Sequence, residues 1–232
     1  MIISINKKVF RKFAKLKIIL FKIKDFDNKS QLKESKLLLK DIETYTRLTF
    51  NKDTIKTHYL ISPLNVAKAD FGRNAKHYHT SVEKLLQNVL KKKRVSTNNV
   101  ISNIFRYLSL KHIVPYALDD FDKIEGDLKF SLANGKEKIK WLNKLEKNNL
   151  FYGDEKRVIG VKFDHWKNPY NKVTATTNKV LGNFLALPPT SQKVINDLIK
   201  DAKSLIKTFC NASVDVYILD NNNSSIELSR SK

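Results

Sequence analysis

Cysteine is almost absent from this sequence: Cys210 is the only one among 232 residues. A single thiol excludes an internal disulfide framework and a zinc site built from cysteines. It fits a reducing, intracellular setting, such as a cytoplasm, a nucleoid or an organelle matrix, rather than secretion. The sequence also lacks any run of about 18 apolar residues, so it predicts no transmembrane segment.

Signatures of catalysis and cofactor binding are missing as well. The sequence contains no glycine-rich phosphate loop, no dinucleotide-binding fingerprint and no Ser/His/Asp arrangement of a hydrolase. We therefore predict neither a cofactor nor a resident metal, and we favour a binding protein over an enzyme. Acidic residues are absent from the first 24 positions, which hold eight basic residues.

The charge that is present is strongly positive and unevenly distributed. Basic residues number 44 against 23 acidic ones, and the formal net charge is +21. Residues 1–110 carry 24 basic and 8 acidic residues, so they hold 16 of the 21 excess charges. The excess positive charges of this half repel one another unless a polyanion neutralises them. The phosphate of DNA or RNA is the usual such partner. The alternative is a lysine-rich proteome, in which the charge reflects codon usage alone.

The clearest local pattern runs from Thr80 to Lys111. Thr80 and Glu83 form a capping box, which predicts a helix start, and apolar residues then recur at helical spacing. Asn98 or Asn99 can cap a second amphipathic helix. The two helices predict an αα-hairpin with a basic tip. The basic residues expected to contact nucleic acid here are Lys91, Lys92, Lys93, Arg94, Arg106 and Lys111.

The first 24 residues form a basic N-terminal segment. Apolar residues recur at helical spacing from Val9 to Leu20, although residues 16–23 fit a strand equally well. A targeting segment and a helix lying on an anionic membrane surface are alternatives. We favour an arm or first helix that adds three lysines to a polyanion groove, namely Lys8, Lys12 and Lys15.

A second interpretation starts from His77 and His79. A His-hydrophobe-His pair followed by Tyr-x-x-x-Lys, here Tyr107 to Lys111, resembles the motifs of HUH-type nicking enzymes. The resemblance implies a divalent cation on the two histidines and covalent attack on a DNA phosphate by Tyr107. The alternative is that both histidines are loop residues before a helix start and bind no metal.

Residues 118–163 resemble a winged-helix DNA-binding domain in the order of their expected elements. A short helix around Asp119–Glu125 and a longer one over 133–147 would precede a wing hairpin formed by 150–152 and 158–163. The resemblance implies that the longer helix lies in a major groove and that the wing contacts the backbone. A helix and hairpin in an ordinary α+β core is the alternative. The residues expected to face the groove are Lys136, Lys140 and Lys144.

The C-terminal part offers fewer signals. Trp166 and Tyr170 stand near lysines, which suits stacking on exposed bases or closure of a core edge. The strongest amphipathic helix spans 190–209, and its wide apolar stripe is either core or the contact with a second copy of the chain. Acidic residues between 119 and 127 match no calcium or nuclease motif and indicate a solvated helix face.

Together these patterns predict a mostly α fold with minor β structure (α+β). We expect a basic helical nucleic-acid-binding half (1–110), a winged-helix-like unit (111–165), a C-terminal helix and strand (166–220) and a disordered tail (221–232). The first functional hypothesis is a DNA-binding replication initiator or regulator that grips the phosphate backbone. The alternatives are a structural RNA-binding protein, either an organellar ribosomal protein or a viral nucleoprotein, and an HUH-type nicking enzyme.

Overall fold

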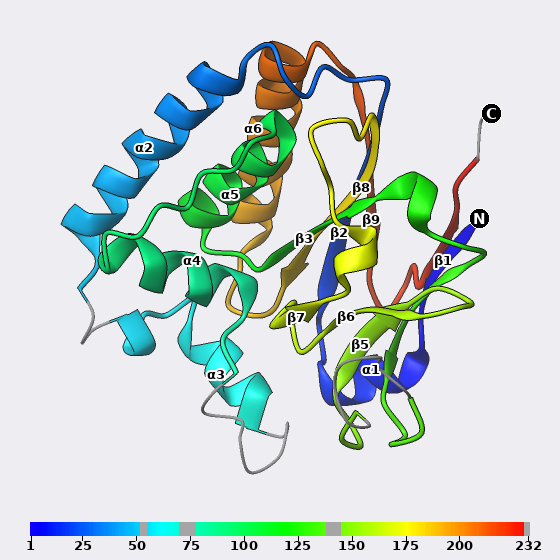
Figure 1. Ribbon diagram of the computed structural model, residues 1–232. Coiled ribbons are helices and arrows are strands. Elements are labelled where there is room, and N and C mark those ends of the chain that lie inside the picture. Colours follow the sequence, from blue (N-terminus) through cyan, green and yellow to red (C-terminus); the bar gives the residue numbers. More distant parts are fainter. Residues whose placement is uncertain (52–54, 70–77, 138–144, 230–232) are drawn as a thin grey trace.

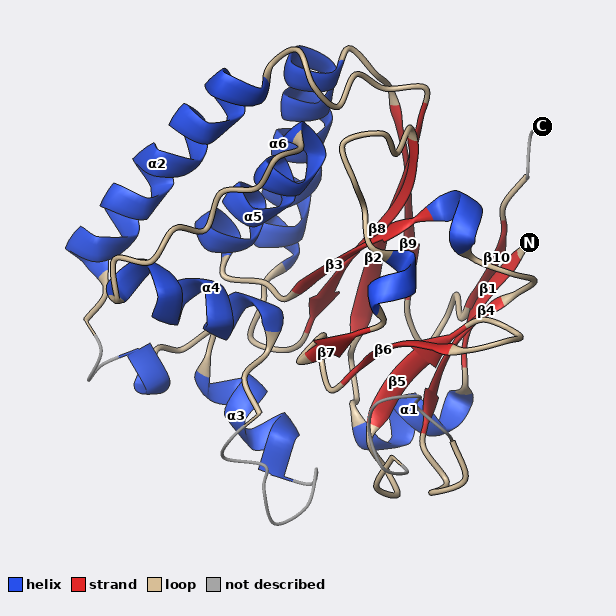
Figure 2. Cartoon of the chain, in the orientation of Figure 1, coloured by secondary structure: helices blue, strands red, loops and turns tan. Residues whose placement is uncertain are grey.

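The computed structural model describes residues 1–51, 55–69, 78–137 and 145–229. The chain folds into three layers, which are a six-stranded sheet, a four-stranded sheet and a group of helices (Figure 1). Among the described residues, helices account for 39% and strands for 23%. Figure 2 shows that α2 to α6 gather on one side of the molecule and the strands on the other, with the short α1 on the strand side.

The four-stranded sheet is the middle layer. Its order is β3 (Tyr116–Asp120), β8 (Lys179–Ala186), β2 (Lys17–Lys24) and β9 (Val214–Leu219), and all neighbours are antiparallel. Residues 18 to 23 of β2 are buried without a break, because the strand is covered on both faces. A strand in this position needs a near-continuous apolar run, so its sequence shows no alternation to distinguish it from a helix.

The six-stranded sheet combines strands from distant parts of the sequence. Its order is β10 (Ser225–Glu227), β1 (Ile2–Ile5), β4 (Leu128–Leu132), β5 (Leu150–Gly153), β6 (Val158–Val161) and β7 (Trp166–Lys167). Only the β1–β4 pair among these is parallel. The expected disordered tail was wrong at β10, which pairs with β1 through backbone hydrogen bonds that the sequence pattern does not reveal.

The helices cover the outer face of the four-stranded sheet. α5 (Val100–His112) and α6 (Gln192–Cys210) pack on the sheet and on each other, and α2 (Leu32–Thr49) packs on α5. The remaining helices are α1 (Lys7–Lys12), α3 (Ser62–Ala69) and α4 (Ser81–Leu90). Short 3₁₀ turns are η1 (Ile55–Thr57), η3 (Phe121–Lys123) and η4 (Pro169–Asn171).

Two hydrophobic cores lie on the two faces of the middle sheet. Between the sheet and the helices, Phe21, Phe105 and Phe184 form a cluster with ring centroids 5.3 to 5.9 Å apart. Between the two sheets, Leu20 packs in the same cluster as Phe130 of β4. Aromatic contacts of this kind stabilise a core beyond the area that they bury.

The helix starts expected from capping residues are confirmed. The Thr80 hydroxyl accepts from the Glu83 amide at 3.4 Å, and the Glu83 carboxylate accepts from the Thr80 amide at 2.7 Å. Asn99 caps α5 by accepting from the Ser102 amide at 3.0 Å. The stripe of α6 is core, because Leu198 and its neighbours on that face are buried against the sheet rather than open to a second copy.

The winged-helix interpretation was wrong. The expected helix around Asp119–Glu125 is instead the end of β3 followed by η3, and β4 lies between it and the expected longer helix. Described residues 133–137 and 145–147 of the expected recognition helix have no helical assignment, and residues 138–144 lie outside the described part. The wing strands exist as β5 and β6, but they pair within the large sheet.

The predicted mostly α class was also wrong, since the fold is mixed α/β with ten strands in two sheets among the described residues. Strands with both faces buried, or with only two to five residues, carry little periodic signal, and helical propensity dominates the sequence pattern. Within the described ranges, no helix is long and apolar enough to cross a membrane.

Replacing Leu198 by alanine tests the position of the α6 stripe. Leu198 is 1% exposed, so Leu198→Ala should lower the free energy of unfolding by about 2–5 kcal/mol. Leu37→Ala is the control: this α2 side chain is 54% exposed, and its loss should cost no more than about 0.5 kcal/mol. Urea unfolding measures both, and equal effects would contradict the assignment of Leu198 to the core.

Candidate functional site

The chain makes an unusual turn directly after β6. Lys162, Phe163 and Asp164 have φ angles of 55°, 55° and 60°, so three successive non-glycine residues lie in the left-handed region. Each costs about 1–2 kcal/mol, and such strain persists only where surrounding contacts hold it. The Lys162 amine lies over the Tyr78 ring, 3.3 Å from its centroid, and Phe163 meets Phe13 edge-on at 5.4 Å. Strain of this kind is concentrated at functional sites.

A pocket of about 730 Å³ opens beside this turn. Its walls come from α4, the segment 94–99, α5, β3 and the segment 164–175. Figure 1 labels the helices and strands that contribute to these walls, namely α4, α5, β3 and β7. Five basic side chains contribute to the wall, and Asp164 is the one acidic residue among the described residues that line it. The basic residues are Lys84, Arg94, Arg106, Lys167 and Lys172.

Asp164 is the most perturbed group in this pocket. Asp164 is 6% exposed, and neither of its carboxyl oxygens has a hydrogen-bond partner among the described residues. Burial raises its pKa to about 7; the charge of Lys167 acts in the opposite direction, and the carboxylate of Asp119 adds to the rise. A carboxyl group with a pKa near 7 can accept or donate a proton at neutral pH.

A second carboxyl group, Asp119 of β3, lies behind the pocket. It is 1% exposed, and it accepts from the Lys167 amine at 2.5 Å and from the Tyr152 hydroxyl at 2.9 Å. Lys167 also donates to the Leu118 carbonyl at 3.3 Å. The ion pair and the hydroxyl together satisfy the Asp119 carboxylate, which contrasts with Asp164.

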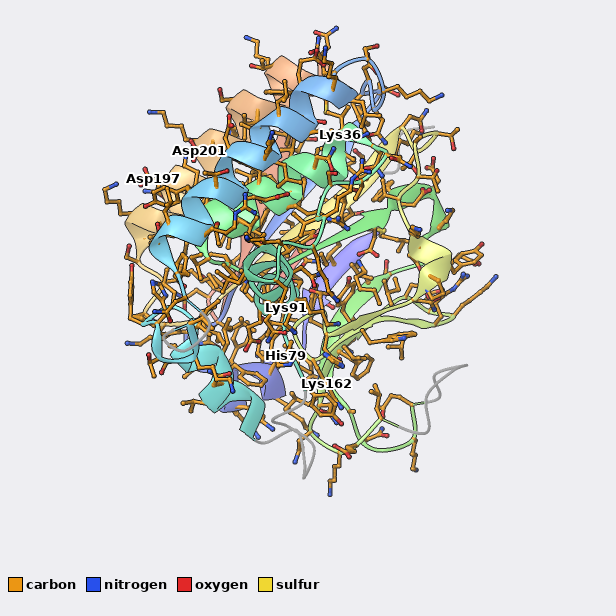
Figure 3. All side chains as sticks on the ribbon, turned by 60° about the vertical axis from the view of Figure 1, so that its left-hand side comes forward. Lys36, His79, Lys91, Lys162, Asp197 and Asp201 are labelled. Atoms are coloured by element: carbon orange, nitrogen blue, oxygen red, sulfur yellow. The ribbon has the colours of Figure 1, made fainter. Side chains whose placement is uncertain are left out.

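Lys84 of α4 completes the polar floor. Its amine donates to the backbone carbonyl of His165, and burial lowers its pKa while the charge of Asp164 acts in the opposite direction. Burial, together with the positive charge of Lys84, lowers the pKa of His165 to about 4, so this imidazole is neutral at pH 7. Its Nδ1 atom lies 3.1 Å from the His79 amide nitrogen and 3.0 Å from the His79 carbonyl oxygen, and Figure 3 shows His79 beside Lys162 of the strained turn.

Two arginines, Arg94 and Arg106, also line the pocket. Arg106 donates to the Tyr116 hydroxyl at 3.3 Å and to the Val95 carbonyl, so its guanidinium is held in place. Arg94 donates to the Ser96 hydroxyl at 2.8 Å. The pocket therefore combines a cationic rim with a buried acid, an arrangement that suits a ligand carrying both an anionic group and a group that exchanges protons.

Comparison with protein families decides the classification of the chain. A family model described as the B3/4 domain matches residues 64–206. This chain belongs to the B3/4 domain family. The match includes the whole wall of the pocket, from Ser81 on α4 to Ala175. No curated protein matches the chain.

Among solved structures, this B3/4 chain is similar to an N-terminal fragment of the phenylalanyl-tRNA synthetase β-subunit from Pyrococcus horikoshii. The TM-score is 0.44 and the sequence identity is 8%. The match covers 91% of this chain and 49% of that one, so the chain spans about half the length of the structure that it matches.

Membership of the B3/4 family overturns the functional hypotheses drawn from charge and local patterns. The DNA-binding initiator or regulator, the structural RNA-binding protein and the HUH-type enzyme were wrong. Of the two histidines in the HUH motif, His79 lies in a loop before α4, and His77 is outside the described residues. Tyr107 lies on α5 and packs against both hydrophobic cores.

The predicted nucleic-acid contacts are scattered over the molecule. Arg94 and Arg106 line the pocket, whereas Lys111 forms an ion pair with Asp201 of α6 at 2.7 Å. Figure 3 shows Lys91 at the end of α4 and Asp201 on another side of the helical layer. The pocket does not include the other described candidates, namely Lys8, Lys12, Lys15, Lys91, Lys92, Lys93 and Lys136. Lys140 and Lys144 lie outside the described residues.

Sequence reasoning missed the polar residues in and behind the pocket. Asp119 was assigned to a solvated helix face, but it lies on a strand and is buried. Asp164 and Lys84 belong to no motif, and Tyr152 was expected only as part of the wing hairpin; the three lie in a turn, on α4 and on β5. The only local signal was a carboxyl group placed directly after an apolar strand ending at residue 163, which is too common a pattern to identify a site.

Replacing Asp164 by asparagine should alter the pH dependence of stability. Its folded pKa of about 7 lies above the ordinary value of 3.8, so the folded chain binds the proton more tightly than the unfolded chain. The stability from this group is complete below about pH 4 and is lost as pH rises towards about pH 7, by up to about 4 kcal/mol. Asp164→Asn should therefore gain stability relative to the parent between pH 4 and pH 8.

Urea unfolding of both proteins at pH 4, 6 and 8 measures this difference. His165, with its lowered pKa, contributes the opposite trend below pH 6.5, but that contribution is common to both proteins and cancels. Asp215→Asn, at an exposed position on β9, is the control and should show a constant difference from the parent. A constant difference for Asp164→Asn too would mean that Asp164 is ionised with an ordinary pKa.

Proposed function

We propose that this B3/4 domain receives the aminoacyl end of a charged tRNA in the Asp164 pocket and removes the amino acid by hydrolysis. The observation that carries the proposal is the buried Asp164 carboxyl group, which has a pKa of about 7 and lies in a pocket that Lys84 also lines. A base whose pKa is close to the working pH is the most effective one for activating water.

The pocket walls suit the two ends of such a substrate. Arg94 and Lys172 at the wall can pair with nucleotide phosphate, and the apolar side chains of Leu85, Val95 and Val173 offer contacts to an amino acid side chain. Aminoacyl-tRNA carries a carboxylic ester on its terminal ribose next to nucleotide phosphates. The rim and the base together therefore point to this class of ester.

The chemical step uses groups of this chain only. The Asp164 carboxylate takes a proton from water while the water oxygen bonds to the ester carbonyl carbon. Lys84 donates a hydrogen bond to the oxygen on which negative charge develops. The bond between that carbon and the ribose oxygen then breaks, and Asp164 returns the proton to the ribose oxygen. The products are the free amino acid and uncharged tRNA.

Deacylation of charged tRNA tests the proposal. The protein is mixed with tRNAs charged with labelled amino acids, and release of each amino acid is followed at pH 7.5. Asp164→Asn should lower the rate by about 10²–10⁴-fold, because it removes the base. Lys84→Gln should lower it by about 10²-fold or more, because it removes the donor to the developing charge.

Two variants at exposed positions serve as matched controls. Asp215→Asn on β9 and Lys200→Gln on α6 repeat the same chemical changes away from the pocket and should leave the rate unchanged. Release of no amino acid from any charged tRNA would contradict the proposed reaction. A rate that Asp164→Asn leaves intact would contradict the assigned base.

A further inference from the structure

A basic cleft lies beside α1, apart from the pocket that holds Asp164. Its volume is about 740 Å³, and the two have no described lining residue in common. One wall comes from α1 and the segment that follows it, and the other comes from the loop between β9 and β10. Figure 2 shows α1 on the strand side of the molecule, whereas α4 and α5 lie on the helix side. We call this region the α1 cleft, and its polar walls are formed by Lys7, Arg11, Lys15, Lys17, Asp220 and Asn222.

The local fold gathers four cations on one wall of the α1 cleft. Lys7 and Arg11 are one helical turn apart, so they share a face of α1. The helix then ends, and Lys15 takes a left-handed conformation with a φ angle of 63°. This turn leads the chain into β2 and brings Lys15 and Lys17 to the same cleft. The side chains of Lys7, Arg11 and Lys15 are exposed.

The opposite wall is a turn held by its own hydrogen bonds. The Asp220 side chain accepts from the amides of Asn222 and Asn223, both at 2.9 Å, and the Asp220 amide donates to the Asn223 carbonyl at 3.0 Å. The Ile5 amide donates to the Ser224 carbonyl at 2.8 Å, which connects this loop to the strand that leads into α1. Both walls are therefore fixed by the fold, as in most ligand sites.

The charges of the α1 cleft are not balanced within the chain. Asp220 is the one acidic residue among the described residues that line it, and its Oδ1 atom is engaged in the turn. Within the described part of the chain, none of the four cations forms an ion pair. Several like charges around one concave surface focus a positive potential there and raise the local concentration of anions. The α1 cleft thus suits a ligand that carries several negative charges.

The types of cation and the shape of the surface favour RNA phosphate. Three of the four cations are lysines, which bind phosphate as point charges, and Arg11 adds a guanidinium that can bind two phosphate oxygens at once. Lys15 and Lys17 also line a neighbouring hollow of about 240 Å³, which extends to Ile195 of α6. Cations along connected hollows suit a chain of phosphates better than a single anion.

We propose that the α1 cleft binds the phosphate backbone of the tRNA whose aminoacyl end enters the Asp164 pocket. This inference rests on the proposed function, which supplies the RNA ligand. The Asp164 pocket, at about 730 Å³, has room for the end of a tRNA only, so affinity for the rest of the molecule comes from other surfaces. Backbone contacts at the α1 cleft position the tRNA without reading its sequence.

Binding of uncharged tRNA, measured between about 50 and 200 mM salt, tests the proposal. The cleft variant combines Lys7→Gln, Arg11→Gln and Lys15→Gln, and it should fold as the parent does because these side chains are exposed. It should bind tRNA about 10–100-fold more weakly. The slope of log affinity against log salt should become shallower by about two to three, because fewer counterions are released.

A matched control removes the same net charge from exposed positions of α6. It combines Lys200→Gln, Lys203→Gln and Lys207→Gln, and it should keep the tRNA affinity within about twofold of the parent. Equal losses of affinity in the two triple variants would show that net charge alone drives binding, and they would overturn the assignment of the α1 cleft.

A free nucleotide is the other source of phosphate that this surface could hold. Calorimetry with ATP, on the parent and on the cleft variant, distinguishes it from RNA. If the cleft variant loses ATP binding but keeps the tRNA affinity of the parent, the assignment to RNA is wrong.

Deacylation kinetics separate the α1 cleft from the proposed reaction. With charged tRNA, the cleft variant should raise KM about as much as it weakens tRNA binding and should leave kcat unchanged. With a 3′-aminoacyl adenosine, which occupies the Asp164 pocket alone, both constants should stay at the parent values. Cleft-dependent tRNA binding without deacylation of any substrate would reject the reaction alone, and deacylation with unchanged KM and tRNA affinity would reject the α1 cleft alone.

Discussion

The burial of β2 on both faces is the constraint on which this fold depends. Six successive residues of this strand are removed from water, and each large aliphatic side chain among them contributes about 1.5–3 kcal/mol. Neither the helices nor the six-stranded sheet alone could cover both faces. The one cation inside this run, Lys22, is accommodated because its amine donates to the Ser229 carbonyl at 2.7 Å, which brings the end of the chain back to the strand.

The candidate site lies at the seam that this three-layer arrangement creates. Asp119 belongs to the edge strand β3 of the middle sheet, whereas Tyr152 and Lys167 belong to the outer sheet. Their polar contacts lie between the two sheets in place of apolar packing, and they satisfy the carboxylate of Asp119, one of two buried carboxyl groups. The other, Asp164, lies in a strained turn without such a partner, and its burial raises its pKa to about 7.

The site also shows how a strongly basic chain can hold an acid that is partly protonated at neutral pH. Lys167 and Lys84 both favour the charged form of Asp164, yet desolvation outweighs them. The reason is that Lys167 is already paired with Asp119, whose own charge opposes ionisation of its neighbour. The overall excess of positive charge on the surface has little influence here, because solvent and salt screen charges that lie more than about 10 Å away.

Local features of the sequence predicted local features of the fold. The capping residues Thr80 and Asn99 identified the starts of α4 and α5, and the apolar stripe of α6 identified a core helix, because both signals arise within a few residues. Strands were likewise expected at 150–152 and 158–163, and β5 (Leu150–Gly153) and β6 (Val158–Val161) lie there. The segment 16–23 could not be assigned, since a strand buried on both faces has no alternating pattern.

The sequence by itself determined where several helices begin, which stripes are apolar and that the chain is basic. Only the tertiary structure decided the class of the fold and the site. Tyr152, Asp119 and Asp164 are separated by up to 45 positions in the sequence, and no spacing rule relates them. Their pairing results from the stacking of two sheets, and the pKa of Asp164 results from burial, a property that exists only once the surrounding layers have assembled.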